Sequence, residues 1–190
     1  MKFISGKRIP LSEASFNDAD FARFYDEHAR RFMRPVYRRF VAKVNGIKPA
    51  GKQVLDIGTG SGRLAIELAK ANPDWQITGV DVSENILKIA REDAAQFVFS
   101  DRIDFRQAPA KALPFPDEHF ALVTSNASLH LWEDPLKVFK EIARVTAPGG
   151  YCFIRDNLRL TVLCPLLNLI GGAMGMNTRS EERRVGKECR

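Results

Sequence analysis

Two acids and a run of glycines are the residues of this chain whose types and spacing point most directly to chemistry. Asp56 lies at the end of a short apolar stretch, and Asp81 closes the next one. Between them the chain has the pattern G-x-G-x-G, whose members are Gly58, Thr59, Gly60, Ser61 and Gly62. Glycines let a backbone turn tightly and let a ligand approach without meeting a Cβ atom. Taken alone, the triplet could also be only a close turn between a strand and a helix.

The position of Asp56 indicates which class of ligand the glycine segment would accept. The spacing differs from the G-x-G-x-x-G that places a pyrophosphate at a helix N-terminus. A carboxylate two residues before the first glycine would also repel a phosphate and suits a ligand with a cationic end. S-adenosylmethionine has a sulfonium and an ammonium group but no phosphate, so the pattern favours it over a nicotinamide dinucleotide. Asp81 can accept both hydrogen bonds of a ribose diol, although an acid before a helix is also ordinary turn chemistry.

The elements around these residues alternate between strands and helices. Short apolar runs predict strands over 54–57, 76–81, 103–106, 120–124 and 151–154. Helices are predicted over 63–71, after an N-cap at Ser83, and after an N-cap at Asp134. In the last helix, Leu136, Phe139, Ile142 and Val145 should face the core, and Pro148-Gly149-Gly150 should end it. This order predicts an α/β fold, Rossmann-like and doubly wound, with a mostly parallel sheet covered on both faces.

Residues 1–50 are expected to form an N-terminal helical cap. Apolar residues at spacings of three and four, among them Phe24, Tyr25 and Phe32, predict a helix over 18–45 that Pro35 breaks or kinks. Basic residues crowd the segment 30–39. They are interpreted as a solvated helix face, with contact to an anionic substrate, a membrane or a nucleic acid as the alternative.

Composition narrows the class of protein. The net charge is +6, and no apolar run reaches the roughly 20 residues of a membrane span. The three cysteines show no C-x-x-C spacing, so neither a metal site nor a disulfide framework is expected. We expect a cytoplasmic protein without stable membrane insertion and without a nucleic-acid partner. The oligomeric state stays open.

Four segments in order resemble the class I S-adenosylmethionine-dependent methyltransferases, especially their small-molecule branch with the ubiquinone- and menaquinone-biosynthesis methyltransferases. They are 54–69, 79–90, 107–135 and 138–156. The resemblance implies a methyltransferase core over 51–178, S-adenosylmethionine as cofactor, and a small-molecule methyl acceptor. A non-catalytic cofactor-binding protein and a protein or nucleic-acid methyltransferase are the alternatives. An Asn/Asp-Pro-Pro-Tyr/Phe run after the fourth strand would signal base methylation, and residues 125–128 here read Ser-Asn-Ala-Ser.

The resemblance also implies roles for the residues of the cofactor site. Those expected to hold the methionine part are Asp56, Gly58, Thr59, Gly60 and Gly62, with backbone at Ser125 and Asn126 lining the same side. Asp81 would hold the ribose, and Val82 would pack on the adenine. Where the family usually has Gly-Asp-Ala, this chain reads Ala-Pro-Ala over 108–110. The acid that often accepts from the adenine amino group is therefore missing, and the amide of Ala110 remains as the adenine contact.

Two further side chains lie where this family meets its substrates. Tyr25 resembles positions that close over the cofactor, and a core aromatic is the alternative. His130, just past the fourth strand, is a candidate base or substrate contact, and a structural role is the alternative. Trp132 is interpreted as packing.

The end of the chain fits no element of this fold. Residues 179–190 resemble the translation of a sequencing-adapter oligonucleotide, and a charged natural tail is the alternative. They hold five basic and three acidic residues, so the remainder carries +4. We therefore expect a chain truncated after the fifth strand and a helix over 158–176. It would lack the last two strands of the family's seven-stranded sheet and leave the fifth strand as an edge.

Overall fold

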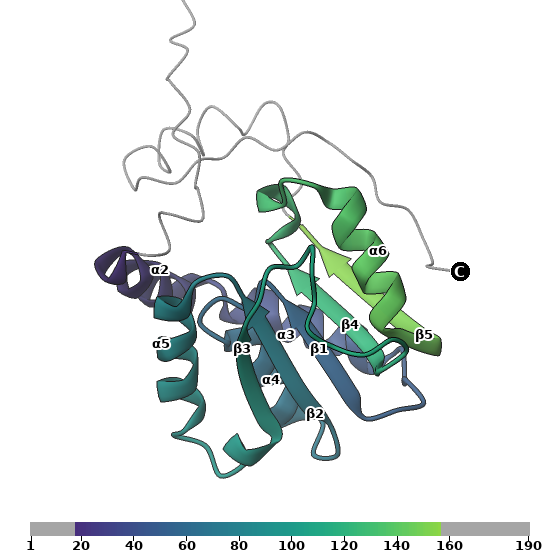
Figure 1. The fold of residues 1–190 in the computed structure, drawn as a ribbon. Coiled ribbons are helices and arrows are strands. Elements are labelled where there is room, and N and C mark those ends of the chain that lie inside the picture. Colours follow the sequence, from purple (N-terminus) through teal and green to yellow (C-terminus); the bar gives the residue numbers. More distant parts are fainter. Residues whose placement is uncertain (1–17, 157–190) are drawn as a thin grey trace, which may run out of the picture.

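The computed structural model describes residues 18–156, which form one sheet with helices on both sides (Figure 1). The helices are α2 (Ala19–Phe32), α3 (Arg34–Asn45), α4 (Arg63–Ala71), α5 (Glu84–Ala94) and α6 (Pro135–Val145), with 3-10 turns η1 (Ser100–Arg102) and η2 (Leu129–Leu131). The strands are β1 (Gln53–Ile57), β2 (Gln76–Asp81), β3 (Ile103–Gln107), β4 (Phe120–Asn126) and β5 (Thr146–Arg155). The five predicted strands are all present.

The sheet is parallel throughout and has the order β3-β2-β1-β4-β5. This confirms the predicted α/β, Rossmann-like, doubly wound fold. The central strand β1 has four consecutive buried residues, as expected for a strand covered on both faces. Within the described residues β3 and β5 are the edge strands.

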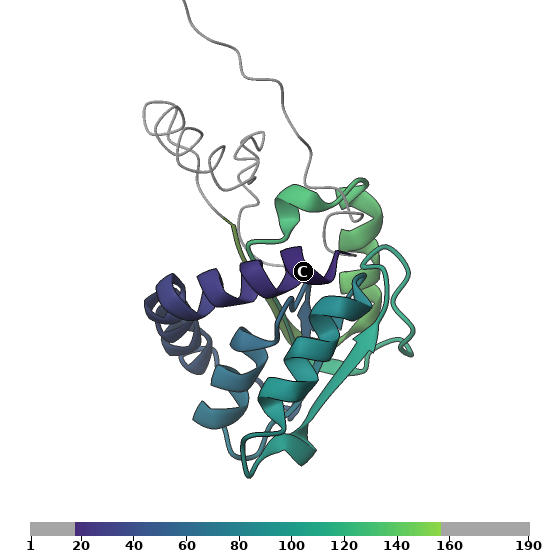
Figure 2. The same ribbon diagram turned by 90° about the vertical axis from the view of Figure 1, so that its left-hand side faces the viewer.

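Two hydrophobic cores lie on opposite faces of the sheet. One gathers apolar residues of α3, α4 and α5 against the sheet, with Phe40, Leu68 and Leu87 fully buried. The other packs α6 against β1 and β4 and includes Leu55, Phe120 and Ile142. The view in Figure 2 shows α6 separated from the other helices by the sheet.

Local signals place the helices where the sequence predicts them. The hydroxyl of Ser83 accepts from the amide of Ile86 at the start of α5, and the carboxylate of Asp134 accepts from the amide of Lys137 at the start of α6. The predicted N-terminal helix is interrupted at Met33, and Pro35 lies in the first turn of α3. A proline is tolerated there because the first amides of a helix have no partner within it.

Two expectations about α6 are wrong. Leu136 does not face the core, since it is 68% exposed, and Val138 is buried instead. The buried face of the helix runs through Val138, Ile142 and Val145, spacings of four and three. The helix also ends at Val145, before the Pro-Gly-Gly of residues 148–150, because Thr146 already pairs with Phe120 as the first residue of β5. The irregular register between Phe120 and Leu122 accommodates the extra residues.

Several predictions fall on residues that the structure does not describe. These are residues 1–17 of the predicted cap, the helix over 158–176, the rest of the proposed core up to 178, and the tail 179–190. Among the residues from 18 to 156, no helix has both the length and the apolar character that a membrane crossing requires.

Candidate functional site

The carboxyl ends of β1 and β4 lie side by side at the point where the strand order reverses. The chain runs from β1 outward through β2 and β3, then returns to β4 and β5 on the other side of β1 (Figure 1). Open α/β sheets bind ligands in the crevice outside such a point. The glycine loop 58–62 follows β1 directly, and Asp81 is the last residue of β2. The predicted site residues therefore meet at one end of the sheet.

The glycine loop folds over the end of β2. The amides of Gly58 and Thr59 both donate to the carbonyl of Val80, at 2.9 and 3.0 Å. Gly58 and Gly60 have left-handed backbones, with φ of +67° and +56°. A Cβ at Gly58 would lie 2.5 Å from that of Ser128, whereas at Gly60 the nearest atoms, from Ile86 and Tyr25, would be 3.8 Å away. Close packing against Ser128 thus requires a glycine at position 58, whereas at Gly60 the left-handed backbone, and not a steric contact, favours glycine.

Replacing Gly58 with alanine is expected to lower the free energy of unfolding by about 3 kcal/mol, from backbone strain together with a steric clash. Gly149→Ala is the matched control because Gly149 has a similar φ of +72° and nothing within 4 Å of its virtual Cβ. Gly149→Ala should lower the free energy of unfolding by about 1 kcal/mol, from the backbone strain alone. Urea denaturation measures both values. Equal losses would mean that Ser128 moves aside and that the close packing is not required.

Asp56 is a buried carboxylate whose described partners are neutral hydroxyl groups. Its side chain accepts from Thr59 Oγ1 at 2.7 Å and from Thr124 Oγ1 at 2.9 Å. Burial raises the pKa of Asp56 to about 6; the two hydroxyl groups oppose that rise, and the charge of Asp81 adds to it. Among residues 18–156 no ion pair involves Asp56. The Asp56 carboxylate is therefore available to form an ion pair with a cationic group of a ligand.

Asp81 holds the glycine loop and the start of α5 together. One carboxylate oxygen accepts from the amide of Gly60 at 2.9 Å, and the other accepts from the amide of Ser83 at 3.1 Å. These bonds fix the carboxylate at the rim of the crevice. Carboxylate oxygens can each accept more than one hydrogen bond, so this arrangement is compatible with a diol as an additional partner.

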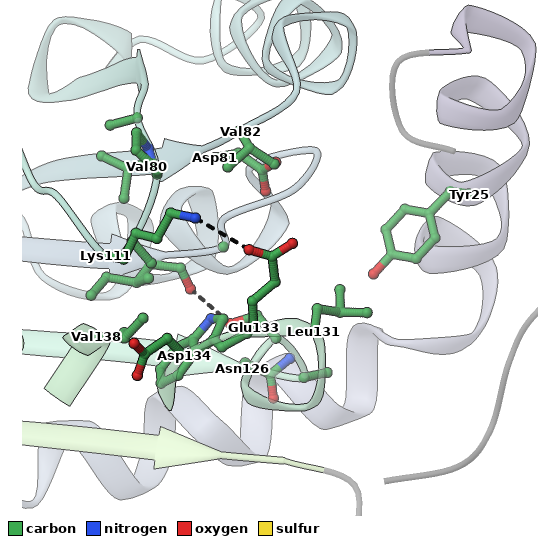
Figure 3. A pocket seen from close by; sticks show the side chains of 18 residues that line it. Tyr25, Val80, Asp81, Val82, Lys111, Asn126, Leu131, Glu133, Asp134 and Val138 are labelled. Atoms are coloured by element: carbon green, nitrogen blue, oxygen red, sulfur yellow. Dashed lines mark hydrogen bonds and ion pairs between the residues drawn. The ribbon is translucent and has the colours of Figure 1, made fainter. Parts of the chain in front are cut away.

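A cleft opens next to Asp81 (Figure 3). Its space, including the open mouth, amounts to about 960 Å³. The predicted site residues that line it are Tyr25, Gly58, Asp81, Val82, Ala110 and Asn126. Leu131, Trp132 and Val138 add apolar surface. Lys111 and Glu133 approach each other across the cleft, with Lys111 Nζ 3.2 Å from a Glu133 oxygen.

A second, smaller cavity, which Asp56 lines, adjoins the first. It shares Tyr25, Gly58, Asn126 and Ala127 with the larger cleft. Its other lining residues are Met33, Tyr37, Asp56, Thr59 and Leu64. The sequence analysis missed Met33 and Tyr37, although Tyr25, Met33 and Tyr37 are spaced by eight and four residues, a helical period. Trp132 was interpreted as packing; it packs edge-to-face on Phe139, with ring centroids 5.7 Å apart, and also lines the cleft.

Four predicted site residues, Gly60, Gly62, Ser125 and His130, line neither cavity. Ser125 is fully buried, and its hydroxyl lies 2.6 Å from that of Ser128. Gly62 packs on Phe105 and Ala90. His130 is absent from the lining of both cavities, and its Nδ1 lies 3.0 Å from a carboxylate oxygen of Asp156, whose other oxygen accepts from the His130 amide. The roles predicted for these four residues stay predictions.

Metal-binding side chains do not gather at this site. Between residues 18 and 156 no group of three or more His, Cys, Asp or Glu side chains could hold a metal ion. The carboxylates of Asp56 and Asp81 instead accept hydrogen bonds from Thr59 and from the amide of Gly60, respectively.

Comparison with known proteins assigns the family. Residues 55–154 match the model of a family described as methyltransferase domain. The 27-O-demethylrifamycin SV methyltransferase of Amycolatopsis mediterranei is 36% identical over 78% of this chain and 52% of its own length. A ubiquinone/menaquinone biosynthesis C-methyltransferase of Pseudomonas putida is 34% identical over 65% of this chain and 48% of its own length. The chain thus spans about half the length of these curated relatives.

Solved structures share the fold. A candidate S-adenosyl-L-methionine-dependent methyltransferase of Methanococcus maripaludis has a TM-score of 0.72 and 27% identity, over 92% of this chain and 75% of that one. The phosphoethanolamine N-methyltransferase 2 of Haemonchus contortus, in complex with S-adenosyl-L-methionine, has a TM-score of 0.63 and 27% identity, over 72% and 32%. The [4+2]-cyclase SpnF has a TM-score of 0.57 and 34% identity, over 61% and 43%. The family match, the strand order and the glycine loop agree, and the chain belongs to the class I methyltransferase domain family.

Proposed function

We propose that this chain binds S-adenosyl-L-methionine in the cleft beside Asp81 and supports methyl transfer to a small-molecule acceptor. One observation carries the proposal: the carboxylate of Asp56 is buried under the glycine loop with neutral hydroxyl groups as its described partners. A cationic ligand that needs no phosphate site fits this arrangement. The relatives named above, a rifamycin methyltransferase and a ubiquinone/menaquinone methyltransferase, support a small-molecule acceptor.

The residues present are compatible with the adenine, ribose and methionine parts of this cofactor. Asp81 would accept the ribose diol, and Val82 and the backbone at Ala110 would border the adenine in the larger cleft. Asp56 and the glycine loop would hold the methionine end, next to the smaller cavity. Pro109 lines the cleft where the family often has an acid, so adenine would rest on apolar contact and backbone groups there.

In methyl transfer the protein mainly has to align the acceptor with the methyl group and exclude water from the site. When bound, the cofactor supplies a methyl group on a positively charged sulfur. The side chains of Tyr25 in α2, Met33 between the helices and Tyr37 in α3 would cover the methionine end. Their apolar bulk would keep water from the reacting atoms. We infer that acceptor specificity resides in these helices and in the loop after β4. For His130 we propose a substrate contact or a base, oriented by Asp156.

Calorimetric titration of the chain with S-adenosyl-L-methionine tests the proposal. We expect saturable binding at one site, and no binding of NAD, whose pyrophosphate the Asp56 carboxylate would repel. Circular dichroism on the same sample shows whether the chain is folded. A folded chain that binds NAD, or that binds neither ligand, would contradict the cofactor assignment.

A second candidate function keeps the fold and the cofactor but not the methyl transfer. The similarity to the [4+2]-cyclase SpnF favours it, because that protein is named for a different reaction. Turnover assays with bound cofactor separate the two: a methyltransferase converts S-adenosyl-L-methionine to S-adenosylhomocysteine in the presence of its acceptor. We also propose that the chain has no nucleic-acid partner, since after β4 it lacks the motif of base methylation. A cytoplasmic location is proposed because the three cysteines show no disulfide or metal-binding spacing.

A further inference from the structure

Four charged side chains join α2 to α5 and to α4, the helix that follows the glycine loop. Asp26 of α2 accepts from Arg63 Nη2 and Nε, both at 3.1 Å, and from Arg30 Nε at 2.7 Å. Asp93 of α5 accepts from Arg30 Nη2 at 2.5 Å and from Arg63 Nη2. Both carboxylates are buried, with 5% and 4% of their surface exposed. We refer to Asp26, Arg30, Arg63 and Asp93 as the charge cluster.

The described contacts of α2 leave little apolar burial to hold this helix in place. Its buried side chains among those that the structure describes are Ala22, Asp26 and Ala29. Two of its large apolar side chains point outward, with Phe24 44% and Phe32 55% exposed. Burying an alanine methyl group contributes little beside a leucine or phenylalanine. Asp26 lies between these two alanines on the buried face, so among the described contacts the charge cluster is the most specific anchor of α2.

The residue next to Asp26 reaches the proposed cofactor site. Tyr25 lines both cavities, and its phenol projects from α2 toward the cleft (Figure 3). Its ring edge lies 3.8 Å from the position that a Cβ on Gly60 would occupy. The partner of Asp26 in α4, Arg63, directly follows Gly62 and is the first residue of that helix. The charge cluster therefore ties the element that carries Tyr25 to the loop that would hold the cofactor.

We propose that Asp26, Arg63 and Asp93 are positioning residues that hold Tyr25 over the cofactor cleft. The inference rests on the proposed function, because it assigns Tyr25 a contact with the bound cofactor. Removing one member of a buried ion network leaves the others uncompensated, so α2 should detach locally while the sheet stays intact. The charge cluster would act on cofactor binding only through Tyr25.

A double-mutant cycle tests this coupling. The dissociation constant for S-adenosyl-L-methionine is measured by calorimetry for the unchanged chain, Tyr25→Ala, Asp26→Asn and the double variant. We expect each single substitution to weaken binding by about tenfold, or about 1.4 kcal/mol, and the double variant to bind no more than about twofold worse than Tyr25→Ala, because coupled sites are not additive. Additive losses would overturn the proposal, since the charge cluster would then act elsewhere.

Hydrogen exchange without any ligand provides an independent readout. In Asp26→Asn, the amides of α2 should exchange faster while those of β1 and β4 keep their protection. Arg30→Gln is a milder variant because the Arg30 side chain is 48% exposed, and it should show the same pattern with a smaller change. The control Asp74→Asn removes the acid of an exposed pair with Lys52 and should change neither exchange nor affinity.

These measurements separate the two proposals. Unchanged exchange of α2 in Asp26→Asn would overturn the charge cluster as an anchor, whatever the chain binds. Faster exchange with unchanged affinity would overturn the role of Tyr25 and leave the proposed function standing. If the folded, unchanged chain does not bind S-adenosyl-L-methionine, the proposed function fails, and the assignment of Tyr25 to the cofactor fails with it.

Discussion

Replacing Asp81 with alanine is expected to weaken the binding of S-adenosyl-L-methionine by about 100-fold or more. The carboxylate would accept the ribose diol, and charge-assisted hydrogen bonds of this kind contribute about 1.5–3 kcal/mol each. It also accepts from the amide of Gly60 and so holds the glycine loop. Both contributions are lost in the variant, and about 2.8 kcal/mol corresponds to a factor of 100. Calorimetry on folded protein measures the change.

Two further substitutions make this result specific. Asp81→Asn keeps one acceptor oxygen and removes the charge, so its affinity should fall between those of the unchanged chain and the alanine variant. Asp104→Asn alters an exposed acid of β3 that pairs with Arg106 and should leave affinity unchanged. If Asp81→Ala binds as tightly as the unchanged chain, the ribose does not lie at the end of β2 and the placement of the cofactor is wrong.

The parts of the site that the sequence predicts are those built from one contiguous strand, turn and helix. Asp56, the glycine loop and the helix after it follow one another along the chain, so their relative positions depend on local geometry. Asp81 follows from the same logic because parallel strands end at the same edge of a sheet. Turn and capping residues also act locally, and Ser83 and Asp134 cap the helices predicted for them.

The contacts that the sequence does not predict join distant segments. Arg63 meets Asp26 and Asp93 across 37 and 30 positions, and nothing in the residue types indicates which acid an arginine will find. The error at Leu136 has a related cause. On α6 the packing against β1 and β4 selects the face with Val138, whereas the apolar pattern alone is also compatible with a face that includes Leu136. Packing direction is a property of the assembled sheet.

The second large effect is expected from Asp56, where stability and binding should change in opposite directions. In the folded chain the pKa of Asp56 is raised from 3.8 to about 6. The folded state therefore holds this proton more tightly than the unfolded state, and between these two pKa values its stability falls as pH rises. Above pH 6 the ionised carboxylate costs about 2–3 kcal/mol, given 1.36 kcal/mol per pKa unit.

Asp56→Asn should accordingly raise the free energy of unfolding at pH 7.5 by about 2 kcal/mol, because the amide avoids the cost of a buried charge. The hydroxyls of Thr59 and Thr124 can accept as well as donate, so both hydrogen bonds can persist with their direction reversed where needed. Urea denaturation at pH 4.5, 6.0 and 7.5 measures the effect. The gain should shrink toward pH 4.5, where the carboxyl of the unchanged chain is protonated in the folded state.

The same substitution should weaken S-adenosyl-L-methionine binding by about tenfold or more, since the cationic end of the ligand loses its acid. In the unchanged chain, affinity should fall as pH drops below 6, by up to about tenfold per pH unit, because binding then requires Asp56 to release its proton. Two results would contradict this account. One is an Asp56→Asn variant that is less stable than the unchanged chain at pH 7.5. The other is an affinity of the unchanged chain for S-adenosyl-L-methionine that does not depend on pH between 5 and 7.5. A buried acid that lowers the stability of the free chain but increases its affinity for a cation is typical of a binding site. An acid in a structural ion pair would instead stabilise the free chain.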